Sequence, residues 1–167
     1  MKVIVLVSVF LCFSSSVHAL DCTYWWGKAD PEIKTDGPAI DETVSANVIA
    51  GIECLLKLEG RKRRGIRFGS KPEVSQRVPM ASVEVNALYT ISELFYGSDA
   101  FATAVALIGV PPQLSGEFGT LVFNSDEDTA KAFRSYRKWF QRVKEIGLKE
   151  SRHCRLDPLA NSGVRWY

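Results

Sequence analysis

The chain has 167 residues, a formal net charge of +2 and 46% hydrophobic residues. This length and composition are those of one ordinary globular domain, large enough to bury a core without a metal ion. The small net charge argues against a nucleic-acid-binding protein and against an acidic tail, so any electrostatic recognition is expected to be local.

Residues 1–19 have the pattern of an export signal. Lys2 precedes an apolar run over residues 3–13, and small residues lead to a cleavage position after Ala19. The run is well short of the roughly 20 residues that a membrane-spanning helix needs. We therefore expect cleavage near Ala19, a periplasmic or secreted location, no membrane-spanning segment, and a single helical domain over residues 20–167.

The first half of the mature chain is predicted to contain two helices. Residues 20–39 lack a regular hydrophobic period and are expected to be an extended lead-in. An amphipathic helix is expected from Ile40 to Leu58, and a second from Ser82 to Tyr96 with Ser82 as its N-cap. Residues 60–79, rich in glycine, proline and basic residues, are expected to form a long loop between them.

The second half is predicted to add two more main helices and a short terminal one. Asp99 to Ile108 is apolar nearly all round, which predicts a helix inside the core. Residues 110–124 are expected to be a loop, in which residues 121–123 either pair as a short strand or fill the core. Ser125 opens the clearest helix, and a helical turn follows from Leu148 to Leu156. The predicted class is all-α: a bundle of four main helices plus a short C-terminal helix, with long loops and at most a minor hairpin.

Three cysteines, Cys22, Cys54 and Cys154, remain after removal of the signal. An oxidising compartment favours one disulfide and a spare thiol, with three pairings that the sequence does not rank. No two cysteines are close in sequence, and His153 is the one histidine left, so no metal site is expected. We expect His153 on the surface and Cys154 either disulfide-bonded or buried.

Enzymatic motifs are absent from the sequence, which contains no nucleophile elbow, phosphate-binding glycine loop or zinc-binding helix. We therefore expect no cofactor, and a binding protein rather than an enzyme. An acid and base pair remains open among the carboxylates near the mature N-terminus, although a helix first turn for Asp41 and Glu42 and a solvated loop for the others is the simpler explanation. These carboxylates are Asp30, Glu32, Asp36, Asp41 and Glu42.

The sharpest local feature is a run of positive charge in residues 60–79, which hold seven basic residues and one glutamate. Cations this close repel one another in an exposed loop, and an anionic partner would relieve the repulsion. Candidate partners are an acidic protein, an anionic glycan or lipid head group, or the chain's own acidic N-terminal segment. The candidate contact residues are Arg61, Lys62, Arg63, Arg64 and Arg67.

Aromatic residues mark both ends of the mature chain. Exposed, Trp25 and Trp26 would stack on sugar rings or anchor an interface. Buried, they would fix the N-terminal segment to the helical body. We keep Trp25 and Trp26 as candidate partner-binding residues beside the basic run.

The C-terminal third carries a resemblance. Residues 136–140, residues 146–148, the LDPL sequence at 156–159 and the closing GVRWY at 163–167 resemble a group of uncharacterised exported bacterial proteins. That group implies no catalytic residues. In size, export and helical content the chain is also similar to periplasmic immunity proteins, which neutralise toxins delivered between bacteria.

These observations lead to three functional hypotheses. The first is a periplasmic binding protein, of the immunity or inhibitor type, that engages a partner protein through residues 60–79 or 110–124. The second is an envelope binder of anionic glycan or lipid that uses the basic loop. The third is an envelope hydrolase that uses the N-terminal carboxylates or His153.

Overall fold

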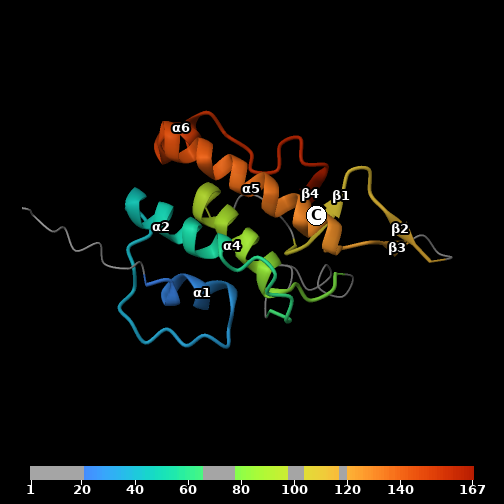
Figure 1. Ribbon diagram of the computed structural model, residues 1–167, viewed down its shortest axis with the longest axis horizontal. Helices are drawn as coiled ribbons and strands as arrows, with labels where there is room; N and C mark the ends of the chain where they lie inside the picture. The colour runs from blue at the N-terminus through green and yellow to red at the C-terminus, as the bar shows by residue number, and fades with distance from the viewer. Residues whose placement is uncertain (1–20, 66–77, 98–103, 117–119) are drawn as a thin grey trace, which may run out of the picture.

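The computed structural model describes residues 21–65, 78–97, 104–116 and 120–167. The signal-like segment 1–19 and Arg67 lie outside these residues. Within them the chain forms five helices and two small antiparallel sheets. Figure 1 shows α1 on one side, α2 and α4 in the middle, and α5 with α6 on the other side. The predicted all-α class is therefore correct only in its coarser form, because a mostly helical body also carries four short strands.

Helix α1, Thr23–Ala29, occupies a segment that was expected to be extended. A helix of seven residues is too short to be stable alone and depends on tertiary packing. That packing comes from Trp25, which is 1% exposed and lies against α2 (Ser45–Leu56). A side chain at Gly51 would place its Cβ only 2.7 Å from the Trp25 ring, so glycine permits this close approach. The prediction of an extended lead-in is wrong here because a single buried tryptophan carries no periodic signal.

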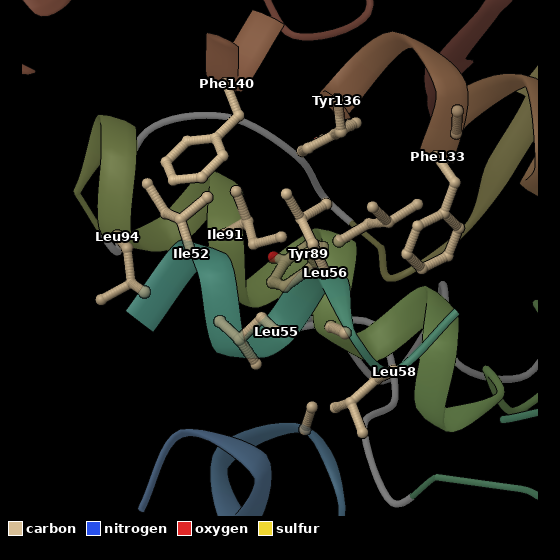
Figure 2. Packing of buried hydrophobic residues seen from close by; sticks show 14 of the residues in the cluster. Ile52, Leu55, Leu56, Leu58, Tyr89, Ile91, Leu94, Phe133, Tyr136 and Phe140 are labelled. Atoms are coloured by element: carbon tan, nitrogen blue, oxygen red, sulfur yellow. The ribbon is translucent and has the colours of Figure 1, made fainter. Parts of the chain in front are cut away.

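Helix α4, Val83–Tyr96, is the central helix of the body. Ser82 caps it as predicted, since its hydroxyl accepts a hydrogen bond from Val85 N at 3.3 Å. Nearly every residue of α4 is buried, including the polar Asn86, whose Nδ2 donates to Ala29 O, and Ser92, whose Oγ bonds Tyr136. Its neighbours on α2 and α5 form the core that Figure 2 shows. The labelled members are Ile52, Leu55, Leu56, Leu58, Tyr89, Ile91, Leu94, Phe133, Tyr136 and Phe140.

The helix expected over Asp99–Ile108 is contradicted where the structure describes it. Residues 107–109 form β1, Leu107–Gly109, which pairs with β4, Val164–Trp166, in antiparallel register with Leu107 opposite Trp166. Periodicity does not distinguish a buried strand from a helix in a short apolar run. The partner strand, more than 50 residues later, decides between them.

The second sheet is a hairpin of β2, Leu114–Ser115, and β3, Thr120–Leu121. The expected pairing of residues 121–123 is confirmed for Leu121, while Phe123 packs against the small cluster of Val78, Ala104 and Ala106. Figure 1 shows this hairpin projecting from the end of the molecule opposite α6.

Helices α5, Asp126–Ile146, and α6, Leu148–His153, complete the body. Ser125 caps α5 as predicted: its Oγ accepts from Asp128 N at 3.1 Å and donates to Asp128 Oδ2 at 2.8 Å. Helix α5 packs against α2, α4 and both strands of the β1–β4 sheet. It therefore connects the helical body to the end that carries the hairpin.

The disulfide joins Cys22 to Cys54 and so ties α1 to α2. Cys154 is a free, exposed thiol, which contradicts the expectation that it would be bonded or buried. Its Sγ donates to Glu150 Oε1 at 3.2 Å, and this hydrogen bond to a carboxylate is the main cause that raises the pKa of the Cys154 thiol. A thiol with a raised pKa is less reactive at neutral pH.

Candidate functional site

The basic segment, Arg61 to Arg64, is held against the body by its backbone. Val83 N donates to Arg63 O at 2.9 Å, and Gly65 N donates to Ala81 O at 2.8 Å. These bonds flank an isolated antiparallel bridge between Arg64 and Ser82. The basic segment is thus fixed beside the start of α4, whereas the sequence predicted an open loop.

Two of the four cations in the basic segment pair with the chain's own acids. Arg63 forms ion pairs with Asp30, which is 2% exposed, and with Glu32 at 2.7 Å. Lys62 Nζ lies 2.6 Å from Asp126 Oδ2 at the start of α5, and this hydrogen bond is the main cause that raises the Lys62 pKa. The acidic N-terminal segment, one of the partners expected for the basic run, is confirmed as the partner of Arg63.

The other two cations of the basic segment face solvent. Arg61 and Arg64 are exposed, and no ion pair involves either within the part of the chain that the structure describes. Arg67 lies outside that part. The charge left for an external partner in the described basic segment is therefore two arginines instead of four cations.

The two tryptophans proposed as partner contacts have structural roles. Trp25 is buried between α1 and α2, so its ring is withdrawn from the surface and this expectation is corrected. Trp26 is partly buried, and its Nε1 donates to Cys54 O at 2.8 Å. Both rings therefore stabilise the same junction that the disulfide closes.

The projecting hairpin, defined by the described residues 110–116 and 120–123, carries the two most exposed large apolar side chains of the described chain. Leu114 is 64% exposed and Val110 is 53% exposed, while Tyr167 lies at the base of the hairpin in edge-to-face contact with Phe123. Apolar side chains gathered on a projection differ from the single exposed apolar residues that occur on any surface.

The base of the projecting hairpin is rigidly attached. Val110 N donates to Gly163 O at 2.8 Å, which continues the β1–β4 pairing into the hairpin. Asn124 N donates to Leu107 O at 2.9 Å, and Asn124 Oδ1 accepts from Leu107 N at 2.7 Å. The exposed apolar residues are therefore presented from a fixed base.

A cleft of about 690 Å³ lies at the opposite end, around the C-terminal end of α4. Its walls come from α1, from residues 42–43 before α2, from α4 and from α6. A cleft of this size falls within the range of small-molecule sites. The charged residues of its lining are Lys28, Glu42, Glu93 and Arg152.

The groups expected for a hydrolase do not gather into one site. His153 is exposed at the end of α6 and is not part of the cleft lining. Asp30 is paired with Arg63, and the exposed Asp41 accepts hydrogen bonds from Thr43. Of the five N-terminal carboxylates, Glu42 alone lines the cleft. Asp41 and Glu42 also lie ahead of the first turn of α2, which begins at Ser45.

The described residues offer neither a metal-binding cluster nor a membrane-spanning helix. They contain no group of three or more histidine, cysteine, aspartate or glutamate residues placed to hold a metal ion. None of their helices is both long and apolar enough to span a membrane.

Comparison of the chain with protein-family models, with curated proteins and with solved structures finds no match. The likeness to exported proteins and to immunity proteins consequently stays a prediction. The function of the chain is therefore inferred from its surface, above all from the projecting hairpin.

Proposed function

We propose that the chain is an exported binding protein that engages a partner protein in the cell envelope, in the manner of a periplasmic immunity protein or inhibitor. The projecting hairpin is its main contact. The observation that carries the proposal is the pair Val110 and Leu114, both more than half exposed on a projection whose base is hydrogen-bonded to the body. Export is supported by the signal-like N-terminus and by the Cys22–Cys54 disulfide, which is consistent with an oxidising compartment.

Physical considerations favour a concave partner site. A fixed projection loses little conformational entropy on binding, and a few side chains that become fully buried in pockets of the partner supply most of the binding energy of many interfaces. The two solvent-facing arginines, Arg61 and Arg64, belong to the basic segment. Lys62 of this segment pairs with Asp126 at the start of α5, five residues after the end of β3. The two arginines fit the acidic rim of such a site, where charges mainly raise the association rate.

The structure gives less support to an anionic glycan or lipid as the main partner. Lys62 and Arg63 already have carboxylate partners within the chain. A polyanion that used them would first have to displace those carboxylates.

Affinity purification of the disulfide-intact mature chain from an envelope extract tests the proposal, with Leu114→Asp compared to the wild type. A carboxylate at this position cannot be buried in an apolar pocket without a large desolvation cost, so we expect loss of the bound protein. The matched control is Val44→Asp, because Val44 is also exposed and apolar but lies at the N-cap of α2, where aspartate is tolerated.

Two results would contradict the proposal. One is recovery of the same protein by the wild type and by Leu114→Asp in equal amount. The other is recovery of no protein in stoichiometric amount, together with binding of anionic polysaccharide or lipid vesicles that added salt abolishes.

A further inference from the structure

The cleft around the end of α4 has features of a binding site that the projecting hairpin does not use. Its lining residues come from α1, from residues 42–43, from α4 and from α6. Figure 1 shows α6 at the end of the molecule opposite the hairpin. The two surfaces are therefore separate, and a ligand in the cleft would not compete directly with a protein on the hairpin.

One wall of the cleft holds a fixed carboxylate with spare capacity. Glu42 Oε1 accepts from Tyr24 Oη at 2.8 Å and from Lys28 Nζ at 2.5 Å. Burial, followed by this bond to Glu42, raises the pKa of Tyr24, so its hydroxyl remains a donor at neutral pH. Both donors use the same oxygen, which orients the carboxylate. Oε2 has no hydrogen bond to the described residues, so a ligand cation would bind there and share the charge of Glu42 with Lys28.

A second wall holds a fixed guanidinium. Arg152 Nη2 donates to Leu94 O at 2.7 Å and its Nε donates to Phe95 O at 3.0 Å. These bonds attach Arg152 to the last carbonyls of α4, where a cation is favoured by the helix dipole. Its Nη1 has no hydrogen bond to the described residues and is left to donate to a carboxylate.

A buried hydroxyl without a hydrogen-bond partner lies in the helix that lines the cleft. Thr90 is 2% exposed and is the most deeply buried polar residue of the cleft lining. Its Oγ1 has no hydrogen-bond partner, although a threonine inside a helix ordinarily bonds to a backbone carbonyl one turn earlier. Such a hydroxyl is uncommon in native proteins. Because its oxygen has almost no accessible surface, a ligand in the cleft would reach it only after a shift of the surrounding side chains.

The charge pattern selects the ligand class. Two cations and two carboxylates line the cleft together, so neither a simple anion nor a simple cation is complementary to the whole surface. Leu94, Phe95 and Tyr96 add an apolar part to the lining. A molecule that carries an ammonium, a carboxylate and an apolar side chain satisfies all three features.

We propose that this cleft binds a small zwitterion, an amino acid or short peptide, with its ammonium at Glu42 and its carboxylate at Arg152. The cleft volume of about 690 Å³ accommodates such a molecule.

Isothermal titration calorimetry on the disulfide-intact mature chain tests the proposal with three probes of nearly equal size. Phenylalanine carries both charges, phenylalaninamide lacks the carboxylate, and N-acetylphenylalanine lacks the ammonium. The same set built on the dipeptide Ala-Phe covers a longer ligand. We expect the zwitterions to bind at least about 10-fold more tightly than either singly charged analogue, because each charge-assisted hydrogen bond contributes a factor of this order.

Variants separate this site from a general charge effect. Glu42→Gln keeps the size of the side chain and should weaken the zwitterions about 10-fold while leaving N-acetylphenylalanine unchanged. Lys34→Met, at an exposed position outside the cleft lining, is the matched control and should bind like the wild type.

Equal affinity for all three probes, or no heat of binding with any of them at millimolar concentration, would overturn the proposal. Because the hairpin variant Leu114→Asp leaves the cleft intact, it should bind phenylalanine normally. Failure at the cleft is thereby distinguished from failure of the proposed protein contact.

Discussion

The basic segment and the projecting hairpin are both loops that the sequence offered as contact surfaces, and the fold treats them in opposite ways. In the basic segment, Lys62 pairs with Asp126 and Arg63 pairs with Asp30. The backbone of this segment is hydrogen-bonded to the start of α4. The hairpin keeps its apolar side chains in solvent, although its base is hydrogen-bonded to Leu107 of β1 and to Gly163, the residue before β4.

The difference shows that a run of like charge is a weak indicator of an external partner. Acids elsewhere in the chain can neutralise it, because an ion pair requires only two side chains within reach. The apolar surface of an exposed side chain, by contrast, is removed from water only when the side chain is buried in the core or in a partner. Apolar residues that remain exposed on a fixed projection are therefore the stronger indicator of binding.

The largest predicted effect concerns the junction that holds Asp30 beside Arg63. Removal of the disulfide by Cys22→Ser with Cys54→Ser should lower the free energy of unfolding by about 3–4 kcal/mol, because the unfolded chain loses a crosslink. The two cysteines are 32 residues apart in sequence. Urea denaturation measures the change, and Cys154→Ser, at an exposed free thiol, should have no effect. A double variant as stable as this control would contradict the role given to the disulfide.

A second prediction tests whether the basic segment is structural. Arg63→Ala should cost about 2 kcal/mol, since it leaves the buried Asp30 carboxylate without its cation. The figure is below that of a fully buried pair because the Arg63 side chain is one-third exposed. Arg64→Ala should change the free energy of unfolding by less than about 0.5 kcal/mol. Equal effects of the two substitutions, measured by denaturation, would remove the distinction between internal and external charges.

A third prediction concerns the attachment of β4, and so the base of the hairpin. Tyr136 Oη accepts from Trp166 Nε1 at 3.0 Å, and Tyr136→Phe should cost about 1 kcal/mol at pH 7 because it removes this hydrogen bond. Burial is the main cause that raises the pKa of Tyr136 well above its usual value of 10.0. The folded protein then holds a proton that the unfolded chain releases, so the stability contributed by this difference is present below pH 10 and is lost as the pH rises above it.

Denaturation at pH 9 and at pH 11 checks this third prediction. The fall in unfolding free energy between the two pH values should be smaller in Tyr136→Phe than in the wild type. Tyr167→Phe, which changes an exposed tyrosine, serves as the control. An identical fall in Tyr136→Phe and the wild type would show that Tyr136 is not responsible.

The smallest predicted effect is that of a substitution in the hairpin on the stability of the fold. Leu114→Ser should change the free energy of unfolding by less than about 0.5 kcal/mol, because the side chain already faces water. The same substitution at the fully buried Leu55 should cost about 3 kcal/mol or more. A comparable loss of unfolding free energy at both positions would mean that Leu114 stabilises the fold, which would contradict its proposed role as an exposed partner contact.

Helices with local signals could be predicted with nearly correct bounds. Ser82 and Ser125 each cap a helix within one residue of the expected start, because a cap needs only the serine and the next turn. By contrast, α1 and β1 were missed. The first depends on contact between Trp25 and Gly51, and the second on pairing with residues 164–166.

The candidate sites were predictable only in part. The sequence indicated residues 110–124 as a contact region, but it did not predict which side chains stay exposed. The cleft was not foreseen, since Lys28, Glu42, Thr90 and Arg152 come from four separate parts of the chain. Even Tyr24 and Glu42, which share one hydrogen bond in the cleft wall, are 18 residues apart, so no local pattern indicated their contact.

The sequence alone therefore determined the mostly helical class, the bounds of α4 and α5, and the presence of one disulfide with a spare thiol. These follow from neighbours within a few residues or from composition. The tertiary structure decided which cysteines pair, which arginines remain free, that Trp25 is buried, and that an apolar hairpin and a charged cleft lie at opposite ends. Each of these depends on residues far apart in the chain, whose contacts are selected by burial and pairing in the folded state.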